Sequence, residues 1–75
     1  MKRHLNLTAL IERSETHYVA TCPELGVVSQ GETRAEAQQN LQEALDLFLE
    51  FAPEAEVKRR LKTDFQVVPL EVAFG

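Results

Sequence analysis

The chain has 75 residues, of which 44% are hydrophobic and 27% charged, and its formal net charge is −4. This length predicts a single domain, residues 1–75, with a modest core. The acidity argues against broad contact with a phosphate backbone, and the single cysteine excludes an internal disulfide. No stretch resembles a secretory signal or a membrane span, so the cytoplasm is the expected compartment.

Two strands are predicted near the start of the chain. Residues 4–12 alternate between apolar and polar side chains, and residues 17–22 form a second strand after a polar gap of hairpin length. The inward face of the first strand should carry Leu5, Leu7, Ala9 and Ile11. We expect the second strand to face inward through Tyr18, Ala20 and Cys22, because the small side chains let a helix approach closely.

A turn and a short third strand follow. Pro23 interrupts the second strand, and Gly26 can supply the positive φ that a tight turn needs. Residues 27–30 then form a β-branched run that is closed by Gly31. Because short gaps join the three strands, an antiparallel meander is the expected arrangement.

The clearest local signal is a capping box that opens a long helix. Thr33 is followed three residues later by Glu36, so the Thr33 hydroxyl can accept from the Glu36 amide while the carboxylate reaches back to the Thr33 amide. Strong helix formers continue to Pro53. The apolar stripe expected to cover the sheet consists of Ala37, Leu41, Ala44, Leu45, Phe48, Phe51 and Ala52.

The end of the chain predicts a short helix and an edge strand. Residues 53–61 carry acids first and bases last, which is the order that a helix dipole favours. Residues 64–74 alternate, and Pro69 places them at a sheet edge. An apolar edge invites a partner, so we expect a homo-oligomer, a dimer or tetramer. The interface residues would be Val68, Leu70, Val72 and Phe74.

These elements predict an α+β fold of two layers, β-β-β-α-(α)-β, in which one long helix covers an antiparallel sheet. No catalytic, cofactor or metal site is predicted. His4, His17 and Cys22 lack zinc-ligand spacing. His17 is expected at the surface without a partner for acid–base chemistry, and Cys22 as a small buried side chain.

Two charged features are candidate contact surfaces. Glu36, Glu43, Asp46 and Glu50 form an acidic stripe on the long helix, opposite its apolar stripe. This stripe is typical of a solvated face and is also suited to docking a basic protein. The basic run Lys58, Arg59, Arg60 and Lys62 is typical of a helix surface, and it is the one feature that supports nucleic-acid binding.

Residues 18–50 resemble the HicB-like family, the antitoxin half of HicA–HicB toxin–antitoxin pairs and its stand-alone relatives. The family pattern is a strand, a Pro-Glu-Leu turn with Gly, a short strand ending in Gln-Gly-acid-Thr, and a helix opening with Glu-Ala. The matching residues are Pro23, Glu24, Leu25, Gly26, Gln30, Gly31, Glu32, Thr33, Glu36 and Ala37. The resemblance implies a partial ribonuclease H-like fold without nuclease activity.

The resemblance also implies a partner, a small basic HicA-like toxin that cleaves mRNA and is occluded by the antitoxin. Many family members carry a C-terminal DNA-binding module, but the residues after the long helix leave no room for one, so DNA binding is not expected. Two alternatives remain open: an orphan oligomeric interaction domain, and a nucleic-acid-binding domain.

Overall fold

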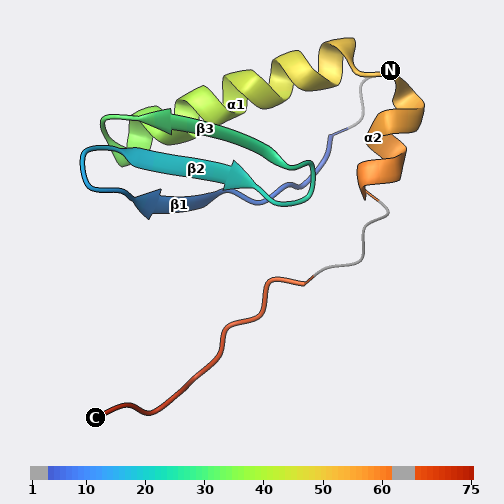
Figure 1. Cartoon of the computed structure of the whole chain (residues 1–75). Helices are drawn as coiled ribbons and strands as arrows, with labels where there is room; N and C mark the ends of the chain where they lie inside the picture. The colour runs from blue at the N-terminus through green and yellow to red at the C-terminus, as the bar shows by residue number, and fades with distance from the viewer. Residues whose placement is uncertain (1–3, 62–65) are drawn as a thin grey trace.

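The structure, a computed structural model, describes residues 4–61 and 66–75 (Figure 1). Three strands precede two helices, which confirms the α+β class and the predicted order up to α2. The elements are β1 (Leu10–Arg13), β2 (Tyr18–Cys22), β3 (Val27–Gly31), α1 (Arg34–Phe51) and α2 (Glu54–Leu61). Among the described residues, no helix is long and apolar enough to cross a membrane.

The sheet is an antiparallel meander in the order β1-β2-β3, as predicted. Leu10 lies opposite Thr21 in the first pair, and Cys22 lies opposite Val27 in the second. Gly26 has φ +69°, and its amide donates to the Cys22 carbonyl oxygen at 2.8 Å. The Pro-Glu-Leu-Gly segment is therefore the tight turn that fixes the register of β2 and β3.

The core lies between the sheet and α1, whose long axis runs over β3 in Figure 1. Its buried members are Ala20, Cys22, Leu25, Ala37, Leu41 and Leu45. Gly31 permits this close packing, because a Cβ at Gly31 would lie 2.5 Å from the Ala37 amide nitrogen. The predicted inward face of the second strand is confirmed, since Ala20 and Cys22 are both fully buried.

One of the two predicted capping hydrogen bonds is present at the start of α1, and the other has a different donor. The Thr33 hydroxyl accepts from the Glu36 amide at 3.0 Å, but the Glu36 carboxylate accepts from the Glu32 amide, at 3.3 Å, and not from the Thr33 amide. The Thr33 backbone is extended at this position. The Glu36 carboxylate consequently binds the amide of Glu32, the residue before Thr33, and the helix start remains fixed against β3.

Glu24 fastens the segment before β1 to the β2–β3 turn. Its carboxylate accepts from the Thr8 amide at 3.0 Å, from the Thr8 hydroxyl at 2.6 Å and from the Cys22 thiol at 3.4 Å. Burial opposes charge on this carboxyl, but the hydrogen bonds from Thr8 outweigh it and lower the pKa of Glu24.

Two predicted strands differ from the structure. The first strand is limited to β1, because the segment before it is held by Glu24 rather than by a strand ladder. The predicted C-terminal strand is wrong for residues 66–75, which form no strand and are exposed; residues 64–65 lie outside the described residues. Pro69 has no amide hydrogen, and the described chain provides no strand beside this segment.

Candidate partner-binding surface

The predicted acidic stripe lies on the outer face of α1. Glu36, Glu43, Asp46 and Glu50 are all exposed. Three of them accept hydrogen bonds from neighbouring amides: Glu36 from the Glu32 backbone at 3.3 Å, and Glu43 and Asp46 from the side chains of Gln39 at 3.4 Å and Gln42 at 3.1 Å. Among the described residues, none of the four carboxylates forms an ion pair. The outer face of α1 therefore presents uncompensated negative charge.

The basic residue of α1 does not neutralise this stripe. Arg34 is its single Lys or Arg, and its guanidinium lies over the Tyr18 ring, 5.1 Å from the centroid. This contact anchors the first turn of the helix to β2. The structure thus brings the four predicted acids together on one face and directs the nearest cation toward the sheet.

An exposed apolar groove, absent from the sequence prediction, borders the acidic stripe. Leu47 is 58% exposed and Phe51 is 74% exposed. The groove has a volume of 560 Å³ between α1 and the start of α2, and it is lined by Ala44, Leu47, Phe48, Phe51, Ala52, Pro53 and Glu56. The prediction that Phe51 covers the sheet is wrong, because the final turn of α1 extends past the core, where Ala37, Leu41 and Leu45 are the buried members of the helix.

The signal that could have identified this groove is the position of Leu47. Leu47 is a large aliphatic residue that lies outside the apolar stripe. Asp46 precedes it directly, and Phe51 follows it four positions later. Residues four apart are neighbours on a helix surface. An exposed aliphatic–aromatic pair beside carboxylates is a composition suited to contact with another protein.

The basic run on α2 is largely committed to contacts within the chain. Lys58 pairs with Glu54 at 3.2 Å, while Arg59 and Arg60 both bind Glu56. The hydrogen bond from Arg60, and then the charge of Arg59, lower the pKa of Glu56. Lys62, the remaining member of the predicted cluster, lies outside the described residues.

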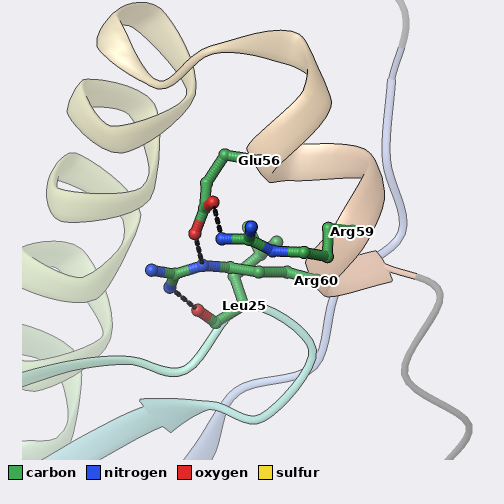
Figure 2. Close-up of polar contacts among 4 residues, drawn as sticks. All are labelled: Leu25, Glu56, Arg59 and Arg60. Carbon is green, nitrogen blue, oxygen red and sulfur yellow. Dashed lines mark hydrogen bonds and ion pairs between the residues drawn. The ribbon is translucent and has the colours of Figure 1, made fainter.

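Arg60 joins α2 to the rest of the fold (Figure 2). Its side chain points between Glu56 and the β2–β3 turn, where it donates to the Leu25 carbonyl oxygen. The same guanidinium lies 4.8 Å from the centroid of the Phe48 ring. Arg60 is therefore a structural clamp, and its charge is balanced by Glu56 rather than displayed to a ligand.

The side chains considered for chemistry do not converge. Burial, followed by the neighbouring Glu24 carboxylate, raises the pKa of the Cys22 thiol, so this cysteine is held in the form that is not nucleophilic. His17 is half-buried, and its Nδ1 lies 3.1 Å from the Thr16 hydroxyl. Within the part of the chain that the structure describes, no group of three or more His, Cys, Asp or Glu side chains could hold a metal ion.

Comparison with known proteins gives one family relationship. No family model matches the chain, and no solved structure matches it. A UPF0150 protein from Helicobacter pylori strain J99 is 38% identical over 70 residues, which cover 92% of this chain and 97% of the relative. A match of this extent includes the three strands and both helices. With this identity across nearly the whole of both proteins, the chain belongs to the UPF0150 family.

Proposed function

We propose that this protein is a non-catalytic, cytoplasmic, HicB-like antitoxin that binds and occludes a small basic HicA-like mRNA-cleaving toxin. The observation that carries the proposal is the outer face of α1, where four exposed carboxylates form no ion pair with any described residue and an exposed apolar groove lies beside the C-terminal half of the helix. A basic protein fits this surface by charge. Leu47 and Phe51 provide the apolar contact that charge alone does not.

The two parts of the surface have different physical roles in this mechanism. Complementary charge accelerates the encounter with a basic partner and makes it sensitive to salt. The exposed Phe51 ring then loses contact with water when the partner closes over it, which slows dissociation. Occlusion requires no reaction on this chain: the toxin is inhibited because its RNA-binding face is covered.

The binding test combines co-purification with charge reversal. The basic protein encoded by a neighbouring reading frame should co-purify with the chain. The double variant Glu43→Lys plus Glu50→Lys should weaken binding at least about tenfold. The matched control is Glu15→Lys, which changes an exposed carboxylate at the β1–β2 turn. Phe51→Ser should also weaken binding while leaving the fold stable, since Phe51 is 74% exposed.

Two outcomes would refute the proposal. The first is that no basic protein co-purifies with the wild-type chain. The second is that the α1 double variant binds as tightly as the Glu15→Lys control, which would place the interface elsewhere. Circular dichroism of each variant should retain the wild-type helical signal, because all the altered side chains are exposed.

The structure gives less support to nucleic-acid binding. Lys58, Arg59 and Arg60 each face a carboxylate on their own helix. A phosphate would have to compete with these acids for the same cations. A gel shift at low salt that weakens steeply as salt rises would favour this alternative over the antitoxin proposal.

A further inference from the structure

The C-terminal segment, residues 66–75, is an extended arm whose residues are all exposed rather than packed against the other described residues. Figure 1 shows it leaving the body of the molecule below α2. Its apolar side chains alternate in sequence and are exposed to water: Val68 59%, Leu70 84%, Val72 79% and Phe74 101%. Ordinary soluble proteins rarely leave such a row of large side chains uncovered.

The sheet has an available edge that matches this arm. β1 is an outermost strand, and no described strand lies beside its outer edge. The opposite edge of the sheet, at β3, is less accessible, because α1 lies over β3 and the Asn40 amide donates to the Gln30 carbonyl oxygen at 2.8 Å. An additional strand would therefore find unoccupied ladder groups at β1.

A groove beside the segment that leads into β1 could receive the side chains of an added strand. It has a volume of 380 Å³ between the segment before β1 and α1. Its floor includes Leu41 and Leu45, and its rim carries Gln42 and Asp46. A cavity of about 150 Å³ holds one benzene molecule, so this groove has room for more than one aliphatic side chain.

We propose that the arm of a second copy of this chain adds as a strand to the outer edge of β1 and buries its even-numbered side chains in this groove. The position of Pro69 fits this arrangement. In a strand, alternate residues direct their amides to opposite edges. If Val68, Leu70 and Val72 bond to β1, the missing amide of Pro69 faces away from the ladder, where it costs nothing.

The occupant is a second copy because of where α2 and the arm lie. Arg60 holds α2 at the β2–β3 turn, and from there the arm runs away from its own sheet. Two copies that each accept the other's arm form a closed dimer with no arm left over. This association also supports a core that is small for an isolated domain. The inference does not rest on toxin binding, because the arm uses another side of α1 and Asp46 is the residue that the two surfaces share.

A pair of proline variants tests the alternation directly. Val72→Pro removes an amide that should bond to β1, whereas the control Ala73→Pro removes one that should face solvent. In analytical ultracentrifugation the wild type and Ala73→Pro should be dimers and Val72→Pro should be a monomer. Each arm side chain that is fully buried contributes about 10- to 150-fold in the dissociation constant, so Leu70→Asp should dissociate the dimer as well.

Hydrogen exchange and photo-crosslinking complete the test. Hydrogen exchange in the wild type should protect the amides of Val68, Leu70 and Val72 more than those of Glu71 and Ala73. A photo-crosslinker at Phe74, in a mixture of heavy and light isotope-labelled chains, should join heavy chains to light ones. A monomeric wild type, equal behaviour of the two proline variants, or crosslinks confined to single chains would each overturn the proposal.

Discussion

Gly31→Ala tests the packing that positions α1 on the sheet. The new Cβ would lie 2.5 Å from the Ala37 amide nitrogen, whereas ordinary contact begins at 3.4 Å, so the helix would have to retreat by about 0.9 Å. The nearest atoms belong to the backbone of Glu36 and Ala37 and cannot rotate away. Overpacking of this kind costs about 1–3 kcal/mol, and we expect a value near the top of that range because the whole first turn has to move.

That cost is large for a chain of this size. A stability of 0.05–0.15 kcal/mol per residue gives about 4–11 kcal/mol here. A loss of about 2–3 kcal/mol should lower the Tm by roughly 10–20 °C. The assay is thermal and urea unfolding followed by circular dichroism, at one fixed protein concentration, because self-association makes the Tm concentration-dependent.

Gly26→Asn is the matched control. Gly26 has a positive φ, which Asn tolerates, and a Cβ there would meet only the Arg60 guanidinium, at 3.9 Å. Gly26→Asn should lower the free energy of unfolding by less than about 1 kcal/mol. If Gly31→Ala unfolds within about 0.5 kcal/mol of the wild type, α1 does not approach β3 as closely as the structure indicates, and the explanation for this glycine fails.

Two further changes probe the contacts that hold the periphery. The pKa of Glu24 is lowered from 4.5, so the stability that the charged carboxylate contributes is complete above that pH and is lost as pH falls through the folded-state value. Urea unfolding should show Glu24→Gln less stable than wild type near pH 7, and the difference in unfolding free energy should close near pH 3. A difference that stays constant with pH would contradict this sign. Arg60→Gln should lower the free energy of unfolding by about 0.5–1.5 kcal/mol and speed hydrogen exchange in α2. Lys58→Gln breaks an exposed ion pair and should lower it by under about 0.5 kcal/mol. Equal effects of the two variants would rule out the Arg60 clamp.

The sequence predicts the centre of this fold well because the signals there are local. Thr33 and Glu36 mark the helix start, Gly26 marks the turn, and the alternation of Tyr18, Ala20 and Cys22 identifies the buried face of β2. Each is set by the conformational preference of one or two residues or by a short period. The three-stranded meander covered by one helix then follows, because short connections leave few other arrangements.

The predictions that failed depend on where elements end or on which partner is present. The period that placed Phe51 on the sheet is correct for a helix, but the sheet ends before the last turn of α1 does. The alternation in residues 66–75 is also real. It describes a segment that can be a strand, while strand formation needs a neighbouring ladder that the described chain does not supply.

The acidic stripe was predicted as a face, but its apolar border was not. Charged residues at a spacing of seven reveal a helix face without any knowledge of the tertiary structure. Whether Leu47 and Phe51 are covered depends on the width of the sheet and on the placement of α2. Arg60 sets that placement through its contacts with Leu25 and Phe48, which no local pattern at Leu47 or Phe51 predicts. The groove between α1 and α2 is therefore a property of the assembled fold.

Helix α1 separates the two proposed interactions. At about 100° per residue, Glu43 lies about 200° around the helix from both Leu41 and Leu45. The carboxylate that would face a basic partner and the leucines that would receive the arm are thus on opposite sides. Asp46 is the common member, because it belongs to the acidic stripe and also lines the rim of the groove. A dimer joined by its arms would consequently keep both acidic faces outward, and each copy could bind a basic partner without releasing the other copy.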